Sequence, residues 1–229
     1  MPGPDTNIAA VLRGTALFSA LSDRELESFA ARTLTRSYAA GELVFSEGEP
    51  CAGLYIVAKG RARIFKTSQA GREQVLSIEG PGGSIAELPV FDGGPYPASF
   101  SAVAPSELLF VSRTDFRALC LEHPAVALKV LEVVGARLRK LVGIIEELSF
   151  TTVRHRLISW ILREVGNEHR GKFTLAVSHQ ELAAQIGTVR ELVSRNLARL
   201  QAQGLIAISG HEVTVLDREG LETELSSVI

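Results

Sequence analysis

One unbroken apolar repeat near the middle of the chain most constrains its fold. In HPAVALKVLEVVGARLRKLVGIIEELSF, apolar residues recur at alternating steps of three and four, namely Leu131, Val134, Leu138, Leu141, Ile145 and Leu148. This is the a/d spacing of a helix that pairs with another helix, and Pro124 suits its first turn. Further valines and isoleucines widen the apolar surface, so the helix needs two partners. We predict a helix over residues 124–150 that packs on its own domain and forms a two-fold dimer interface; a long core helix is the alternative.

The sequence before this helix has a different period. After a helical entry over residues 5–32, short runs from about Arg36 to Ser112 alternate between apolar and polar residues and are separated by glycines, as in LYIVAKGRARIFK around Gly60. Many short strands at this spacing indicate an antiparallel sandwich or barrel. We expect residues 1–123 to form this β-domain.

The composition excludes several other classes of protein. With 46% hydrophobic residues, 22% charged residues and a net charge of −2, the chain reads as a globular protein with real cores. No apolar run is long enough to span a bilayer and no leader pattern is present, so we expect a cytoplasmic protein with no membrane partner. Cys51 and Cys120 lie too far apart in sequence to indicate a disulfide framework.

Residues 151–229 read as three helices, a hairpin and an acidic tail. Ser178-x-x-Glu181 and Thr188-x-x-Glu191 both fit the capping box that starts a helix. Gly187 lies between them, where the chain must reverse in left-handed backbone. Two short helices joined by such a turn predict a helix-turn-helix, and alternation around Ser209-Gly210 predicts the hairpin that follows it.

The second of these helices has two distinct faces at about 100° per residue. Its packing face holds Val189, Leu192, Val193, Asn196 and Leu200, with Leu197 at the border. Its opposite face holds Arg190, Glu191, Ser194, Arg195 and Ala198. Arginine matches the acceptors of guanine in the major groove, and a carboxylate matches the amino group of cytosine. We therefore predict base contacts by Arg190, Glu191, Ser194 and Arg195, although Glu191 cannot cap its helix and bind cytosine simultaneously.

Other side chains of this region are expected to touch the DNA backbone, which positions a protein without reading sequence. These are Lys172, Ser178, Thr188 and Arg199. His179 is expected to be a surface residue of a first helical turn.

The segment SHQELAAQIGTVRELVSRNLARLQAQGLIAISG resembles the winged helix-turn-helix of the CRP/FNR family of bacterial transcription regulators. The strands and long helix before it resemble that family's cyclic-nucleotide-binding-type β-roll and dimerisation helix, so the resemblance covers residues 17–216. It implies an α+β fold: an antiparallel β-roll of the double-stranded β-helix or jelly-roll type, a long dimerisation helix, and a C-terminal winged helix-turn-helix over residues 151–229.

The resemblance also implies a function. The chain would be a homodimeric, non-enzymatic activator or repressor that binds a palindrome in double-stranded DNA and contacts RNA polymerase. Arg190, Glu191 and Arg195 match the Arg-Glu-x-x-x-Arg pattern that reads a TGTGA-like half-site in cyclic-AMP-type members. Glu191, Ser194 and Arg195 match equally well the pattern that reads a TTGAT-like half-site in oxygen-sensing members, so both half-sites stay open.

The expected effector pocket departs from the family pattern for cyclic nucleotides. It comprises Ala86, Glu87, Leu88, Pro97, Ala98, Arg137, Leu141 and Val142. Glu87 stands where those members hold the ribose, but Pro97 and Ala98 stand where an arginine and a serine clamp the phosphate. Leu141 and Val142 replace the hydroxyl pair that contacts adenine. We therefore expect that cyclic AMP is not the effector and that Glu87 has a structural role.

Other sensing chemistries are constrained by residue counts. An iron–sulfur cluster needs about four thiolates, and the chain has two cysteines, so no cluster is expected. Haem in an apolar pocket near Leu141, Val142 and Ile145 stays open, as do a thiol switch at Cys51 or Cys120 and the absence of any effector.

The sequence lacks residues that two other classes of protein with small β-barrel domains require. A cupin-type metalloenzyme needs clustered histidine and glutamate ligands on its barrel strands, but no histidine precedes His123. A cyclic-nucleotide-gated regulatory subunit would lack the helix-turn-helix and would need the missing phosphate arginine. We expect no metal site.

Overall fold

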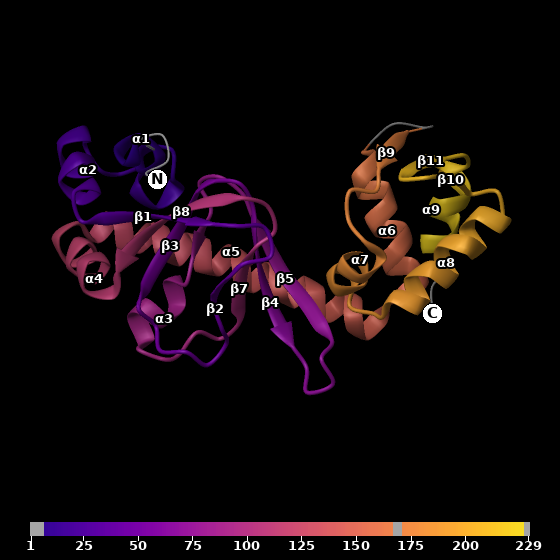
Figure 1. The fold of residues 1–229 in the computed structure, drawn as a ribbon, viewed down its shortest axis with the longest axis horizontal. Helices are drawn as coiled ribbons and strands as arrows, with labels where there is room; N and C mark the ends of the chain where they lie inside the picture. The colour runs from indigo at the N-terminus through magenta and orange to yellow at the C-terminus, as the bar shows by residue number, and fades with distance from the viewer. Residues whose placement is uncertain (1–6, 167–170, 227–229) are drawn as a thin grey trace. The chain divides into compact units, whose positions relative to one another are not determined.

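The computed structural model describes residues 7–166 and 171–226. The chain divides into two compact units, one made of residues up to Lys66 together with Leu76–Leu141, the other of Thr67–Val75 and the residues from Val142 onward. Figure 1 shows the elements of each unit along the chain.

The first unit is a β-roll with helices. Its elements in chain order are α1 (Ile8–Arg13), the 3-10 helix η1 (Ala16–Phe18), α2 (Asp23–Ala30), β1 (Thr33–Tyr38), β2 (Leu43–Phe45), β3 (Gly53–Lys59), β4 (Ala62–Thr67), β5 (Glu73–Glu79), β6 (Ser84–Ile85), α3 (Glu87–Asp92), β7 (Ser99–Ala102), β8 (Ser106–Ser112) and α4 (Arg113–Glu122). They form two four-stranded sheets, with strand orders β1-β8-β3-β6 and β2-β7-β4-β5. The resolved pairings are antiparallel, which confirms the β-roll expected from the sequence.

The alternation of side chains along β3 explains how the first sheet is covered on both faces. Leu54 and Ile56 pack with the helices in one cluster, which also contains Phe18, Phe116 and Val126. Tyr55 and Val57, the neighbours between and beyond them, pack in a second cluster with side chains from the other sheet. Because successive residues of a strand point to opposite faces, one continuous apolar run serves both cores.

The long helix α5 (Pro124–Phe150) begins at the proline that the sequence indicated. Val126 and Val130 are buried on it, and Val133 and Val134 pack partly against the helical core of the β-roll. This arrangement confirms that one side of the helix packs against its own domain.

The second unit holds a helix-turn-helix with a small sheet. Its elements are α6 (Val153–Val165), β9 (Lys172–Thr174), α7 (His179–Ile186), α8 (Arg190–Ala202), β10 (Ile206–Ser209), β11 (Glu212–Val215) and α9 (Arg218–Ser226). The sheet order is β10-β11-β9, and Gly210 takes the positive φ of 60° that the tight hairpin between β10 and β11 requires. The predicted hairpin is therefore present, extended by a third strand that the sequence did not indicate.

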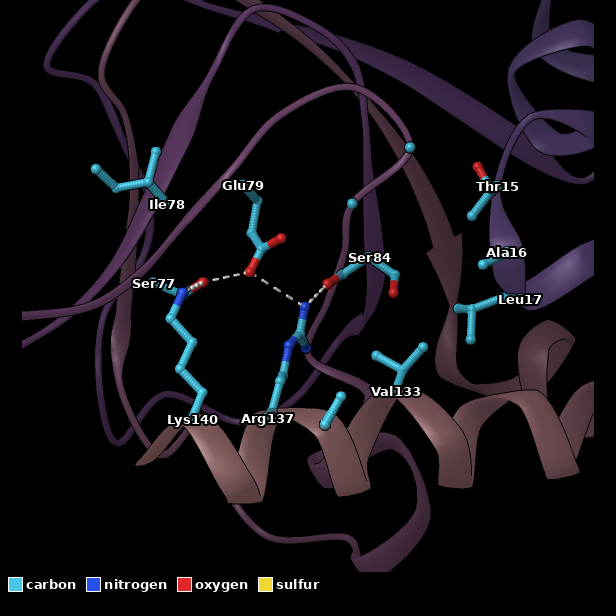
Figure 2. A pocket seen from close by; sticks show the side chains of 13 residues that line it. Thr15, Ala16, Leu17, Ser77, Ile78, Glu79, Ser84, Val133, Arg137 and Lys140 are labelled. Atoms are coloured by element: carbon cyan, nitrogen blue, oxygen red, sulfur yellow. Dashed lines mark hydrogen bonds and ion pairs between the residues drawn. The ribbon is translucent and has the colours of Figure 1, made fainter. Parts of the chain in front are cut away.

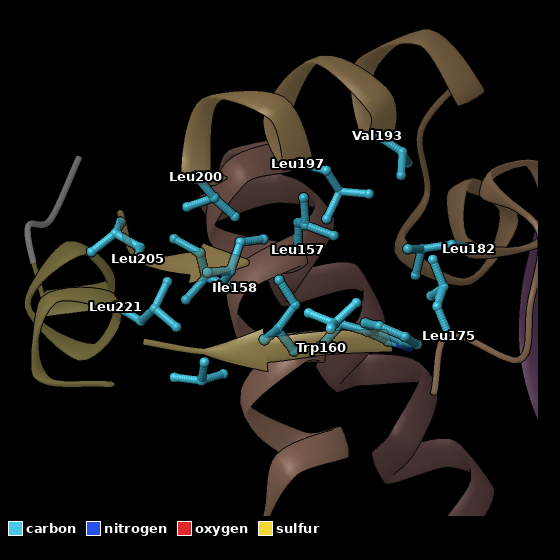
Figure 3. Close-up of a cluster of buried hydrophobic side chains, with 14 of the residues drawn as sticks. Leu157, Ile158, Trp160, Leu175, Leu182, Val193, Leu197, Leu200, Leu205 and Leu221 are labelled. Carbon is cyan, nitrogen blue, oxygen red and sulfur yellow. The ribbon is translucent and has the colours of Figure 1, made fainter. Parts of the chain in front are cut away.

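A single apolar core holds the second unit together, and Figure 3 shows how its side chains converge from several elements. Leu157 and Ile161 of α6, Val193 and Leu200 of α8, and Leu221 of α9 are all buried in it. The sequence suggested only an acidic tail after Leu216. Leu221 shows instead that this segment folds as α9 and completes the core.

Candidate nucleic-acid interface and sensor cavity

The first helix of the helix-turn-helix begins and ends as the sequence predicts. The backbone N–H of Ser178 donates to the Glu181 carboxylate at 2.7 Å, and the Ser178 hydroxyl accepts from the Glu181 N–H at 3.2 Å. This reciprocal capping box satisfies two amide donors that a helix start leaves free. Gly187 ends the helix with φ 67° and ψ 49°, in left-handed backbone, which only glycine adopts without strain.

The start of α8 corrects one prediction. The helix begins at Arg190 with Val189 as its N-cap, and no side chain caps it, so the capping box from Thr188 to Glu191 is wrong. The Thr188 N–H instead donates to the carbonyl of Ala183 at 2.9 Å and closes the previous helix. The turn is therefore longer than the motif suggested, and the Glu191 carboxylate is not engaged in a cap.

The two faces of α8 lie as the sequence predicts. Val193, Asn196, Leu197 and Leu200 are buried, and the buried Asn196 amide donates to the carbonyl of Leu192 at 2.8 Å. Leu192 and Val189 are half-buried, and Ala198 is exposed on the other face.

The charged side chains predicted to touch bases lie on the open face of α8. Arg190, Glu191 and Arg195 are exposed. Among the residues the structure describes, none of the three makes a side-chain hydrogen bond or ion pair. Their hydrogen-bonding groups are therefore available to a partner molecule.

Ser194 differs from the other three predicted base-contacting residues. It is half-buried, and its hydroxyl lies 2.8 Å from the Nδ1 atom of His179. His179 is itself half-buried at the start of α7, so the prediction of a simple surface residue was incomplete: the histidine joins the two helices. Neither residue's pattern in the sequence indicated this pairing, because the two positions meet only when the helices pack.

Arg156 of α6 is a functional candidate that the sequence analysis missed. It is buried, and its guanidinium donates to the carbonyls of Ile186 at 2.7 Å, Thr151 at 2.8 Å and Gly187 at 3.3 Å. Burial lowers the pKa of Arg156 from its ordinary value, and the nearby Glu147 opposes that shift. The side chain thus ties the turn of the helix-turn-helix to the segment before α6. Its place beside Leu157, in an otherwise apolar stripe, was the available signal.

The four residues expected at the DNA backbone lie in different settings. Lys172 on β9 is exposed and pairs with Glu212 of β11 at 3.0 Å. Arg199 is exposed in the last turn of α8, and Ser178 and Thr188 stand next to the starts of α7 and α8.

The expected effector pocket corresponds to a cavity of about 530 Å³ in the first unit. Seven of its predicted residues line it: Ala86, Glu87, Leu88, Pro97, Ala98, Arg137 and Leu141. Val142 does not line the cavity and is 55% exposed; Ile145, named for a haem pocket, also lies outside it. The remaining lining is mainly apolar, from Phe45, Ile64, Leu76, Ile85, Pro89, Tyr96, Val134 and Leu138, with Ser77 and Lys140 at one end.

Glu87 and Arg137 form an ion pair at the edge of this cavity. Glu87 is 1% exposed; its carboxylate accepts from the Ser84 hydroxyl and from the Arg137 guanidinium. Arg137 also donates to the Ser84 carbonyl and lies 3.6 Å from Glu79. Figure 2 shows Arg137 beside Glu79 and Ser84 in a second cavity of about 310 Å³, which shares Arg137 and Lys140 with the first. Both oxygens of Glu87 are therefore occupied by the protein itself.

The end of the cavity near Pro97 is apolar. Ala98 is buried, and Tyr96 stacks on Phe45 with 3.7 Å between ring centroids. The Tyr96 hydroxyl accepts from the Ala52 N–H at 3.1 Å. The Lys66 ammonium, which pairs with Glu47, donates to the Pro97 carbonyl at 3.2 Å but does not line the cavity.

The backbone at Ala86 is strained. Ala86 has φ 74°, the only positive φ of a non-glycine residue in the described part of the chain. A Cβ atom makes this left-handed conformation costly. The strain lies directly before Glu87, at the start of α3.

Neither cysteine has the character of a reactive thiol: Cys120 is buried and Cys51 is half-buried. Burial raises the pKa of Cys120 to about 11 and also raises the pKa of the half-buried Cys51. A thiol held protonated is a weak nucleophile, which disfavours the thiol switch. No cluster of metal-ligating side chains occurs within residues 7–166 and 171–226.

The residues predicted for the dimer interface are mostly exposed in the single chain. Leu131 is 67% exposed, Leu138 61%, Ile145 63% and Leu148 41%, whereas Leu141 is 37% exposed and Val134 is half-buried. None of the helices that the structure describes combines the length and apolar character needed to cross a bilayer.

Two family models match the chain, one in its N-terminal part and one in its C-terminal part. The cyclic nucleotide-binding domain matches residues 35–123, and the Crp-like helix-turn-helix domain matches residues 155–224. The cyclic AMP receptor protein of Thermus thermophilus is 33% identical over 92% of this chain and 97% of its own length. The CRP-like cAMP-activated global transcriptional regulator of Mycobacterium tuberculosis is 28% identical over 92% of this chain and 96% of its own.

Solved structures agree with these relatives. The catabolite activator protein of Thermus thermophilus is 32% identical, with a TM-score of 0.54 over 94% of this chain and 100% of that one. A crp/fnr-family regulator from Eubacterium rectale shares the fold, with a TM-score of 0.77 at 21% identity over 94% and 100% of the two chains. The fold and the helix-turn-helix define a bacterial-type DNA-binding regulator with a β-roll of the cyclic nucleotide-binding type. The chain belongs to the CRP/FNR family of transcription regulators, which are not enzymes.

Proposed function

We propose that this regulator acts as a homodimer on palindromic DNA and does so without cyclic AMP. One α8 helix from each subunit enters a major groove, at half-sites about 34–36 Å apart along the duplex. Contact with RNA polymerase, which the family resemblance implies, belongs to the same proposal. The observation that carries it is the exposed and unpaired state of Arg190, Glu191 and Arg195 on α8.

The chemistry of this face supports recognition of bases that include G·C pairs. The arginine fork suits guanine O6 and N7, and the Glu191 carboxylate, which caps no helix, suits the amino group of cytosine. The TGTGA-like and TTGAT-like half-sites share an inner TGA step. The TTGAT-like pattern uses Ser194, but His179 already engages the Ser194 hydroxyl within the protein. This contact favours the TGTGA-like half-site, which does not use Ser194.

The exposed seam of α5 supports the dimer. Leu131, Leu138 and Ile145 recur along the helix, and each exposes more than half of its surface. Apolar side chains in a continuous row are costly in water and are covered when two such helices pair.

The cavity supports independence from cyclic AMP, although relatives carry that ligand in their names. A cyclic phosphate buried away from water needs a cationic or hydrogen-bonding clamp. The side chains of Pro97 and Ala98 offer neither, and Glu87 is held by Arg137 and Ser84.

A substitution in the α5 seam tests the proposal. Leu131→Glu places a charge in the dimer interface, so we expect sedimentation to show monomers and the affinity for a TGTGA-type or TTGAT-type palindrome to fall at least tenfold. Leu121→Glu is the matched control, because Leu121 is 83% exposed on α4 and lies outside the seam. Equal behaviour of the two variants, or DNA binding by the wild type that requires cyclic AMP, would overturn the proposal.

A further inference from the structure

The cavity lined by Pro97 and Ala98 has the size of a ligand-binding site, but its side chains do not suit a nucleotide. Its volume of about 530 Å³ lies within the range typical of small-molecule sites, which are mostly apolar with a few polar groups. Leucine, isoleucine, proline and aromatic side chains form most of its wall. An occupant must therefore be mainly apolar.

The charges at the other end of the cavity are not equivalent. The Arg137 guanidinium is already engaged within the protein, because it pairs with Glu87, donates to the Ser84 carbonyl and faces Glu79. Lys140 is one turn further along α5, and its ammonium donates to the Ser77 hydroxyl at 3.1 Å. Among the residues described, no carboxylate lies within ion-pair distance of Lys140.

Lys140 is also placed where a ligand can reach it. It is exposed and lines both the cavity of about 530 Å³ and the cavity of about 310 Å³. Figure 2 shows its side chain rising from α5 toward Ser77. The site thus offers one cation without an ion-pair partner at the mouth of an apolar chamber.

A cofactor held by a nitrogen or sulfur ligand does not suit this wall. No histidine, cysteine or methionine lines the cavity in the described part of the chain, and the Tyr96 hydroxyl is already bonded to the Ala52 N–H. An apolar ligand with a single anionic head satisfies both the wall and Lys140.

We propose that the cavity binds a medium-chain aliphatic carboxylate, with its hydrocarbon chain against Leu88, Pro97 and Ala98 and its carboxylate on Lys140. This assignment deepens the proposed function, since it names the effector class of the sensor in a DNA-binding regulator. Leu138 and Leu141 line the cavity and also belong to the dimer seam of α5. A bound chain therefore touches the surface that pairs the subunits.

Calorimetric titration of the full-length protein with decanoate, below its micelle concentration, tests the assignment. We expect saturable binding that strengthens by about fourfold for each methylene between hexanoate and decanoate. We expect Lys140→Met to weaken decanoate binding about tenfold, as befits loss of a charge-assisted hydrogen bond. Lys129→Met is the matched control, because Lys129 lies on the same helix, pairs with Glu132 and does not line the cavity.

A second variant tests the apolar wall without disturbing the core. Leu88 is 51% exposed and lines the cavity, so Leu88→Glu should fold and repel the ligand, whereas Leu121→Glu should bind decanoate like the wild type. Equal binding of decanol and decanoate, unchanged binding by Lys140→Met, or tighter binding of cyclic AMP or haem than of decanoate would overturn the assignment. DNA affinity measured without ligand reports on the proposed function separately, so the two proposals can fail independently.

Discussion

Arg137 of the β-roll and two arginines of the helix-turn-helix, Arg190 and Arg195, are placed in opposite ways. In the β-roll, Arg137 is three-quarters buried and all its charge is directed at Glu87, Ser84 and Glu79. In the helix-turn-helix, Arg190 and Arg195 are exposed and have no partner among the described residues. Arg137 is neutralised within the first unit beside an apolar cavity, whereas Arg190 and Arg195 of the second unit keep their donors available to another molecule.

The difference separates an arginine that holds structure from arginines that remain available for recognition. A buried ion pair contributes little net stability but is costly to break, so Arg137 and Glu87 fix the geometry of the cavity edge. An exposed arginine contributes little to folding, so Arg195 is free to serve recognition. Four experiments test this contrast.

Arg137→Met should have the largest effect on stability. It leaves the Glu87 carboxylate buried without a counter-charge, which costs about 3–5 kcal/mol. Hydrogen exchange at the amides of β3 measures the loss within the first unit. Combining it with Glu87→Gln should restore most of that loss, because the uncompensated charge is then absent. A loss of less than about 1 kcal/mol in the single variant would show that Arg137 is not needed to neutralise Glu87.

Arg156→Met tests a buried arginine of the second unit whose side-chain hydrogen bonds go to backbone carbonyls. Removing the guanidinium leaves the carbonyls of Ile186 and Thr151 without this donor and should cost about 2–3 kcal/mol of unfolding free energy in urea. Specific DNA binding should weaken as well, because the turn before α8 loses its tether. Arg163→Met is the control, since Arg163 is exposed on the same helix. An equal loss of stability and of DNA affinity in the two variants would show that the Arg156 hydrogen bonds do not hold the turn.

Arg195→Ala should leave folding unchanged and weaken specific DNA binding by about 1–3 kcal/mol per half-site. Competition between the palindrome and scrambled duplexes measures the effect. Arg199→Ala should weaken both kinds of DNA equally, since phosphate contacts carry no sequence information. If Arg195→Ala also lowers both equally, Arg195 does not read a base.

The smallest effect concerns two left-handed residues, one in each unit. Ala86 has φ 74° and Gly187 has φ 67°. Ala86→Gly should stabilise the first unit by about 1 kcal/mol, because glycine relieves the strain, and Gly187→Ala should destabilise the second by at least as much. Thermal unfolding of each variant checks the opposite signs, and a destabilised Ala86→Gly would show that its Cβ contacts outweigh the strain.

Much of the fold was predictable because it rests on local periodicity and local capping. The strands, the long helix α5 and the Ser178 capping box each need only neighbouring residues, and the structure confirms them. The pairing of two α5 helices along the a/d stripe stays a prediction. The predicted capping box from Thr188 to Glu191 is wrong although its motif is present. The Thr188 N–H donates to the Ala183 carbonyl instead, which lengthens the turn. Helix boundaries depend on such competition.

The sequence by itself determined the α+β class, the helix-turn-helix, the two faces of α8 and the absence of a cation at positions 97 and 98. Only the tertiary structure decided that Arg137 reaches Glu87, that Arg156 binds Ile186, that His179 meets Ser194 and that Leu221 is buried in a core. The hydrogen-bonded pairs among them join residues between 15 and 50 positions apart. Periodicity assigns a residue to a face, but the partner across that face is set by how the elements pack.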